Sequence, residues 1–333
     1  MSLPCWRLRR GRRTAMPVAL LLATFALVAG APVAARADGI FVADCAFSHR
    51  AADDPIVFHD MPGWSHSHDF FGNGSTDASS TLRSLRRSAG NCVPSKDRSA
   101  YWTPTLYRQG RALKAVHVQA YYQDFFRYGQ VLPFPRGLRM VAGRPTASAP
   151  QRRIVRWTCQ QDHAQGDANV PSCGSTFVTL RITFPDCWDG RRLDSPDHRS
   201  HMAYNAADGL ELGPQRCPRS HPIVVPQLQL NVVYPIHDGK RVTLASGSVA
   251  TAHADFFNGW KPSVLRHRVD DILNGGKACD DYLGCATISA PNSEPVTARP
   301  KANLVDRFYR PRSGSRHGRR PDSGGKAHRT AIG

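Results

Sequence analysis

The sequence lacks the short motifs that mark several large enzyme classes. It contains no G-x-S-x-G nucleophile elbow, no H-E-x-x-H zinc-binding helix, no P-loop and no dinucleotide-binding glycine pattern. It also contains no C-x-x-C pair, the spacing expected of a cysteine-ligated zinc site. These absences remove the best-known hydrolase, nucleotide-binding and zinc-cage signatures as guides to its chemistry.

Apolar residues near the start of the chain form a run too short for a typical membrane span. The run extends over residues 15–29, follows five arginines and precedes small residues that end at Ala37. About 15 apolar residues is short against the roughly 20 that a spanning helix needs. The order basic, apolar, small is typical of a secretory signal peptide. The sequence therefore predicts a signal peptide over residues 1–37, and a retained membrane anchor is the less favoured alternative.

The cysteine count agrees with export. Of the nine cysteines, Cys5 falls in the predicted signal peptide, which leaves an even set. An even set in an oxidising compartment favours disulfides. Pairing neighbours along the chain closes the shortest loops, which suggests the pairs Cys45–Cys92, Cys159–Cys173, Cys187–Cys217 and Cys279–Cys285, although sequence alone leaves other connectivities open.

The net charge of +18 is unevenly distributed. Residues 1–37 hold six arginines and no acid, and residues 291–333 hold ten Lys or Arg against three acids, which leaves +5 for residues 38–290. A domain with this modest charge needs no polyanionic partner, so specific nucleic-acid binding is disfavoured. The segment 291–333 is rich in Pro, Ser, Gly and Arg and is predicted to be a disordered basic tail.

The remaining 38–290 segment is predicted to be one mainly β domain. Strand-like patterns with Pro and Gly clusters between them occur at residues 115–122, 153–157, 177–184 and 228–234. Helical patterns are few, the best being residues 79–88 and 261–274, and a long loop is expected over residues 143–151. Many short strands with few helices indicate a disulfide-containing β-sandwich or jelly-roll-like fold.

Histidines form the most informative pattern. In an extended segment, His66 and His68 share one face and Asp69 points to the other. Two such imidazoles can bind one divalent metal, or one can act as a base while the other stabilises charge. Residues 251–258 repeat the pattern with His253 and Asp255, followed by a second pair of phenylalanines. We therefore interpret His66, His68 and His253 as candidate metal ligands.

A second group of titratable residues lies in a segment rich in Gly and Pro. It contains Asp197, His198 and His201, and His221 follows further on. Such loops commonly carry function. An alternative to a metal site is a pair of carboxylates serving glycoside hydrolysis, chosen from Asp186, Asp189, Asp194 and Asp197. Each histidine taken alone is more often a hydrogen-bonded structural residue.

Several of these segments together resemble a secreted family of bacteria and fungi catalogued as domain of unknown function nineteen ninety-six. The resemblance rests on the segments 54–57, 65–73, 101–107, 133–140, 184–190, 193–202, 217–222 and 253–256. It implies a single secreted domain, and in fungi such domains are sometimes joined to wall-binding modules. That association tilts the expected partner toward polysaccharide, while the tail after residue 290 is not part of the family pattern.

Three hypotheses follow. The first is an extracellular or wall-associated enzyme that cleaves polysaccharide, with catalytic candidates His66, His68, Asp69, His198, His201, His253 and Asp255. The second is a non-catalytic glycan-binding protein, and the residues expected to contact the glycan in either case are Trp64, Tyr101, Trp102, Asp197, Tyr204 and His221. The third is a structural role, in which the histidines belong to a buried polar network and contribute to stability.

Overall fold

The described part of the chain comprises residues 39–124, 130–160, 166–205, 217–280 and 284–287 of a computed structural model. The predicted signal peptide 1–37 and the predicted tail 291–333 lie outside these residues. Within them, no helix combines the length and the apolar character needed to cross a membrane.

Strands dominate the described residues, and helical segments are few and short. The strands are β1 (Gly39–Ala51), β2 (His68–Gly72), β3 (Cys92–Val93), β4 (Ala100–Pro104), β5 (Leu106–Arg108), β6 (Arg111–Ala112), β7 (His117–Asp124), β8 (Arg139–Gly143), β9 (Val155–Cys159), β10 (Val178–Thr183), β11 (Cys187–Trp188), β12 (Met202–Ala203), β13 (Ile223–Val224), β14 (Gln227–Tyr234), β15 (Val242–Leu244), β16 (His253–Phe257), β17 (Lys277–Asp280) and β18 (Gly284–Thr287). The helical segments are α1 (Leu82–Arg87), η1 (Val249–Thr251), α2 (Pro262–Arg268) and η2 (Val269–Leu273). The expected mainly β class is confirmed.

The segments with the clearest sequence patterns adopt the predicted structures. The four predicted strands correspond to β7, β9, β10 and β14, and the two predicted helices to α1 and to α2 with η2. The expected long loop lies between β8 and β9. Helix α1 begins at a capping box, in which Thr81 and Ser84 satisfy each other's backbone N–H groups.

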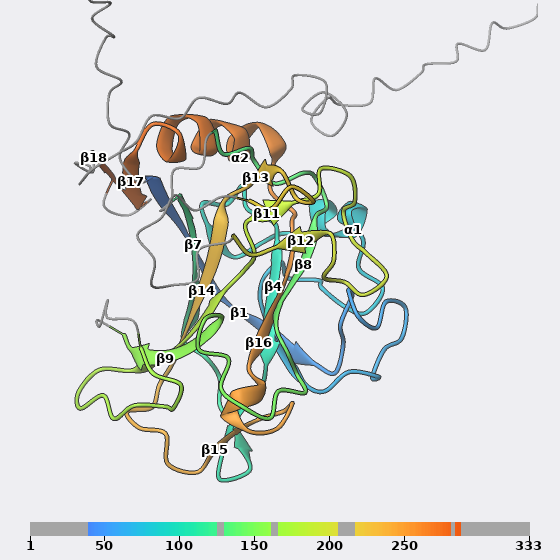
Figure 1. The fold of residues 1–333 in the computed structure, drawn as a ribbon. Coiled ribbons are helices and arrows are strands. Elements are labelled where there is room, and N and C mark those ends of the chain that lie inside the picture. The colour runs from blue at the N-terminus through green and yellow to red at the C-terminus, as the bar shows by residue number, and fades with distance from the viewer. Residues whose placement is uncertain (1–38, 125–129, 161–165, 206–216, 281–283, 288–333) are drawn as a thin grey trace, which may run out of the picture. The chain divides into compact units, whose positions relative to one another are not determined.

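Nine strands of the main sheet pair antiparallel in the order β8-β16-β4-β2-β1-β7-β14-β10-β9, and β17 pairs in parallel with β1 (Figure 1). The long strand β1 joins its two halves, because its first part pairs with β7 and its last part with β2. A bulge between Phe47 and His49 marks the change of partner, and bulges bend the strands that carry them. The two halves thus enclose a core in the manner of a sandwich.

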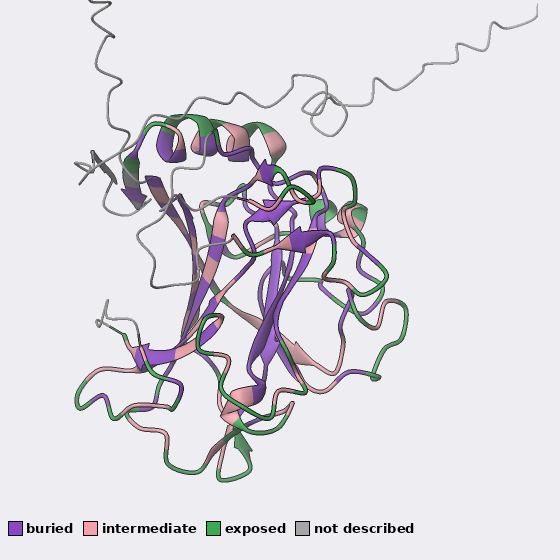
Figure 2. Ribbon diagram, viewed as in Figure 1, coloured by how far each residue is buried: buried purple, intermediate pink, exposed green. Residues whose placement is uncertain are grey.

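The main core takes apolar side chains from both halves of the sheet. Phe41 of β1 stacks on Tyr122 of β7 at 4.7 Å, and Trp260 lies edge-on to both rings. From the other half, Phe256 of β16 packs against Tyr101 and Phe134. Figure 2 shows buried residues along these strands.

A second, smaller apolar cluster covers the opposite face of β2, β4, β16 and β8. It contains Phe70, Trp102, Val141 and Phe257, which alternate along these strands with residues of the main core. Leu85 of α1 and the residues before β2 close this face. Strands β2, β4 and β16 are therefore buried on both faces, and a polar side chain among them needs a partner.

Three of the four expected disulfides are confirmed: Cys45–Cys92, Cys159–Cys173 and Cys187–Cys217. Cys279 is also disulfide-bonded, and its backbone lies opposite that of Cys285 in the β17–β18 pair. The side chain of Cys285 lies outside the described part of the chain.

Candidate functional site

Three histidines lie together on the face of β2 and β16 that the smaller apolar cluster covers. We call this group the histidine cluster (His66, His68 and His253). The ring of His66 lies 4.3 Å from that of His68 and 5.0 Å from that of His253, measured between centroids. One nitrogen of each ring lies within 4.8 Å of the others. His68 and His253 are buried, and His66 is partly exposed. The cluster therefore reaches solvent beside His66.

Backbone carbonyls orient two of the three rings. Nδ1 of His68 lies 3.0 Å from the carbonyl oxygen of Asp53, and Nδ1 of His253 lies 2.9 Å from that of Thr251. A carbonyl oxygen can only accept, so each Nδ1 carries a proton and each neutral ring keeps its lone pair on Nε2. Metal-binding histidines usually donate their other ring N–H to a carbonyl or carboxylate oxygen in this way, which fixes the orientation of the ring. Nε2 of His68, and likewise that of His66, is buried without a hydrogen-bond partner.

Two buried carboxylates adjoin the histidine cluster. Asp255 lies two residues after His253 on the same face of β16, and neither of its oxygens has a hydrogen-bond partner. One oxygen of Asp54 accepts the N–H groups of Ile56 and Val57. Ligand atoms of Asp54, His68 and Asp255 also lie within 4.8 Å of one another. His68 thus belongs to both groups.

Burial sets the protonation of the cluster. It lowers the pKa of His66, and burial together with the other two imidazoles lowers the pKa of His68 far below its ordinary value. Burial lowers the pKa of His253 to about 3. The imidazoles are therefore neutral at physiological pH, as metal ligands must be.

The two carboxylates shift in the opposite direction. Burial raises the pKa of Asp255 well above its ordinary value, and repulsion from Asp54 adds to the rise. Burial also raises the pKa of Asp54. Buried acids without a counter-ion are costly, so this face has a deficit of positive charge. Positive charge nearby comes from Arg199, which lowers the pKa of both Asp255 and His253.

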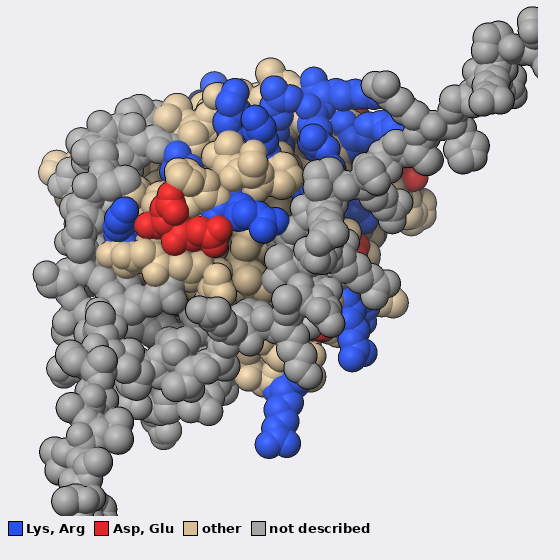
Figure 3. Space-filling model, turned by 90° about the horizontal axis from the view of Figure 1, so that it is seen from above, with Lys and Arg blue, Asp and Glu red and all other residues tan. Residues whose placement is uncertain are grey.

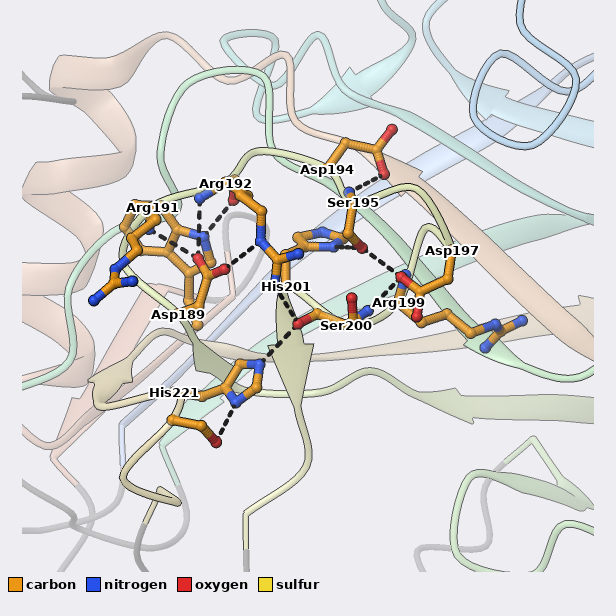
Figure 4. Close-up of polar contacts among 12 residues, drawn as sticks. Asp189, Arg191, Arg192, Asp194, Ser195, Asp197, Arg199, Ser200, His201 and His221 are labelled. Carbon is orange, nitrogen blue, oxygen red and sulfur yellow. Dashed lines mark hydrogen bonds and ion pairs between the residues drawn. The ribbon is translucent and has the colours of Figure 1, made fainter.

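The second predicted group, residues 194–201, forms a loop that packs against β8 (Figure 4). Oγ of Ser195 lies 2.7 Å from a carboxylate oxygen of Asp197 and 2.9 Å from Nδ1 of His201. Nε2 of His201 donates to the carbonyl oxygen of Arg139, and the ring is fully buried. His201 thus has no free nitrogen for a substrate and serves to hold the loop.

This loop nevertheless borders the histidine cluster. Asp197 accepts the backbone N–H groups of Arg199 and Ser200, which shapes the turn that carries Arg199. His198 pairs with Asp194 at 3.0 Å, and both residues contribute to the electrostatic environment of Asp54. The loop therefore supplies charge to the cluster, while His198 and His201 themselves stay outside it.

Asp69 lies on the opposite face of β2 from the histidine cluster. Its carboxylate pairs with Arg50 at 2.6 Å and accepts a hydrogen bond from Thr105. The prediction of Asp69 as a catalytic residue therefore conflicts with the strand alternation, which places Asp69 on the other face of β2 from His68.

Of the expected glycan-contacting aromatics, two are fully buried. Tyr101 contacts Asp97 and Tyr122 inside the main core, and Trp102 stacks on Phe70. Neither ring is available to a glycan in this structure.

The other expected contact residues lie nearer the surface. Tyr204 is 39% exposed and donates to the carbonyl oxygen of Thr183, and His221 contacts the carbonyl oxygen of Ser200. Trp64 is 69% exposed and lies two residues before His66. Trp64 is therefore an exposed aromatic residue that is close in sequence to the histidine cluster.

Sequence reasoning did not place Asp54 or Arg199 in the site. Both stand in segments that carried the family resemblance, but each is separated from its spatial neighbours by a loop or by several strands. Two features of the sequence could have pointed to them: the segment Asp54-Pro55-Ile56-Val57, and the position of Arg199 between His198 and His201.

The chain belongs to the family described as Domain of unknown function (DUF1996), which matches residues 54–260. The matched segment begins at Asp54 and includes the three histidines of the cluster together with Asp54, Arg199 and Asp255. No curated protein and no solved structure matches the chain.

Proposed function

We propose that this member of the family is a secreted, divalent-metal-dependent enzyme that cleaves polysaccharide, with His66, His68 and His253 as metal ligands. The observation that carries the proposal is the convergence of three neutral imidazoles, two of them oriented by Nδ1 hydrogen bonds to backbone carbonyls. Secretion is supported by the disulfides, which persist in oxidising compartments.

The donor set selects a class of metal. Imidazole nitrogens favour Zn²⁺, Cu²⁺, Fe²⁺ or Ni²⁺ over the hard ions Mg²⁺ and Ca²⁺. A divalent cation would also favour the ionised form of Asp255, whose two oxygens have no other partner. Asp54 would keep one oxygen on the N–H groups of Ile56 and Val57 and offer the other. Bound there, a metal would supply Lewis acidity and lower the pKa of a water molecule.

The chain's own residues would provide the remaining functions. The partly exposed side of the cluster at His66 is where a substrate would approach. Trp64 would stack on a sugar ring, since its indole is mostly exposed. Arg199 would stabilise negative charge that develops on the substrate, because it carries the nearest positive charge from the neighbouring loop.

The first test is the metal content of the full chain, purified from an oxidising compartment without a polyhistidine tag. We expect near-stoichiometric metal in the wild type and loss of it in the His66→Ala/His253→Ala variant. The matched control is His237→Ala/His267→Ala, which removes two exposed histidines outside the cluster. Equal metal in all three proteins, or none in the wild type after incubation with Zn²⁺, would refute the metal site.

The second test is digestion of a panel of polysaccharides by the metal-loaded wild type and by the two double variants. Products from the wild type and the control, but not from the cluster variant, would support the enzyme. Background-level product from all three would leave the metal site intact and remove the claim of catalysis.

A glycan-binding protein without turnover is the second candidate, and the exposure of Trp64 favours it. In that case Trp64→Ala would reduce retention on an insoluble polysaccharide at least severalfold. The His66→Ala/His253→Ala variant would be retained like the wild type. Stacking of a nucleobase on an aromatic side chain contributes about 1–3 kcal/mol in nucleic-acid complexes. We take this as the scale of the binding free energy that Trp64→Ala would remove.

A further inference from the structure

A hollow of about 270 Å³ lies on another part of the surface and is lined by four cationic residues. We call it the basic hollow (Arg86, Lys96, Arg98 and Lys261, with Gly259). These residues come from α1, from the segment before β4 and from the segment that joins β16 to α2. Figure 3 shows lysine and arginine side chains gathered on the face of the molecule that is seen from above.

The walls of the hollow are held together by backbone contacts. The N–H of Lys261 donates to the carbonyl oxygen of Lys96 at 3.0 Å, and a guanidinium nitrogen of Arg98 donates to the carbonyl oxygen of Arg86. Gly259 lies directly against Arg98, and a Cβ atom there would collide with the carbonyl oxygen of Arg98. The hollow is thus built from three fixed segments, with no side chain at Gly259.

Among the described residues, the positive charges of the hollow have no acidic partners. None of these residues brings a carboxylate to its lining, and none forms an ion pair with any of its four cationic side chains. Asp97 stands between Lys96 and Arg98 in the sequence, but its side chain is fully buried. Its carboxylate accepts hydrogen bonds from Tyr101 and Ser99 instead.

A fifth cation adds to this excess of charge. The pKa of Arg136 is lowered by burial and, in addition, by repulsion from Arg86. Nε of Arg136 is buried without a hydrogen-bond partner. Like charges gathered around a hollow without counter-ions favour an anionic ligand.

We infer that the basic hollow is a binding site for a phosphate group carried by a sugar or a polymer. Guanidinium groups bind tetrahedral oxyanions through paired N–H donors, and lysines add charge without a fixed geometry. Two arginines and two lysines match a doubly charged phosphate better than a single carboxylate. The volume of the hollow, about 270 Å³, is several times the roughly 30 Å³ of one water, so a group larger than a water molecule can enter it.

The basic hollow is separate from the histidine cluster. His253 begins β16 and Phe257 ends it, and at about 3.3 Å per residue these positions are roughly 13 Å apart. Gly259 lies beyond Phe257. The inference therefore stands whether or not the histidine cluster binds a metal.

Calorimetric titration of the full chain with inorganic phosphate, glucose 6-phosphate and a glycerol phosphodiester tests the site. We expect binding by the wild type that weakens at high salt, because exposed charges are screened. The Lys96→Gln/Lys261→Gln variant is expected to lose at least about tenfold in affinity, or 1.4 kcal/mol. Both lysines are exposed, and the hydrogen bond between them joins backbone atoms, so the variant keeps the fold.

The control is Lys240→Gln/Lys277→Gln, which removes the same charge from exposed positions away from the hollow. An equal loss in the control, or no difference between the wild type and the Lys96→Gln/Lys261→Gln variant, would overturn the inference. Equally tight binding of polygalacturonate would overturn the choice of phosphate over carboxylate. Preference for the monoester indicates a small sugar phosphate as the source, and equal binding of the diester indicates a polymer.

Discussion

The rings of His68 and His253 lie 5.7 Å apart and almost perpendicular, although the two residues open different strands. Strand β4 runs between them, and its register explains the contact. His68 pairs with Pro104, and Asp255, two residues after His253, pairs with Trp102, two residues before Pro104. Both histidines therefore stand level with Pro104 on either side of it, and their rings lean across the strand between them.

Metal binding is expected to stabilise the fold. Zn²⁺ added to chelator-treated protein should raise the melting temperature, because a ligand that binds only the native state stabilises it by about 2.7 kcal/mol at a hundredfold excess over its Kd. Thermal melts with and without Zn²⁺ measure this. The His66→Ala/His253→Ala variant should show no shift, whereas His267→Ala, which alters an exposed residue of α2, should respond like the wild type.

The substitution Asp255→Asn should have opposite effects on metal affinity and on the metal-free fold. Metal affinity is expected to fall at least about tenfold, because the negative charge of a carboxylate that adjoins the three ligands is lost. The metal-free protein should gain about 1 kcal/mol in free energy of unfolding, since a buried ionisable group without a partner is removed. Urea melts in chelator and competitive metal titrations test the two effects. A variant that is less stable without metal would argue that Asp255 has a structural partner.

Asp69 is expected to act in stability alone. In Arg50→Met the fully buried carboxylate of Asp69 would lose the guanidinium at 2.6 Å and keep only Thr105. Breaking a buried pair from one side costs about 3 kcal/mol, which urea melts would show. Zn²⁺ affinity should be unchanged, since Asp69 lies on the other face of β2. A parallel loss of metal affinity would contradict this separation.

The pH dependence of stability should reveal the buried carboxyl of Asp97. Burial raises its pKa to about 6, although hydrogen bonds from Ser99 and Tyr101 oppose the rise. Between pH 3.8 and pH 6 the native state thus holds a proton that the unfolded state has released. Stability from this group therefore falls as pH rises through that window, by on the order of 3 kcal/mol.

The comparison that isolates Asp97 is the wild type against Asp97→Asn in urea melts across pH 4–7. Relative to the wild type, the variant should gain stability as pH rises, because it has no proton to lose. The difference should level off above about pH 6. A difference that stays constant across the range would mean that the pKa of Asp97 is not raised.

Local patterns in the sequence predicted much of the fold. The strands β7, β9, β10 and β14 were predicted because β-branched and aromatic residues at period two do not depend on which strands pair. The three confirmed disulfides were predicted because neighbouring cysteines close short loops. The short strands β11, β12 and β13 have too few residues to show any period.

For the site, too, local patterns predicted some features and missed those that depend on distant segments. Period-two alternation placed His66 with His68 and Asp69 away from them, and the echo at residues 251–258 drew attention to His253 and Asp255. Its aromatic ring made Trp102 a candidate for contact with glycan, but residue type does not report that both faces of β4 are covered. Burial of both faces depends on α1 and the long loops, which come from elsewhere in the chain.

The sequence by itself determined which residues could serve as ligands and which segments with a clear period-two pattern form strands, and it favoured the observed cysteine pairs without fixing them. Only the tertiary structure decided that β16 lies next to β4, and so that His253 meets His68 and that Asp54 and Arg199 border them. The reason is physical: strand pairing in an antiparallel sheet rests on contacts between distant segments, whereas a period-two pattern records only which side of its own strand each residue occupies.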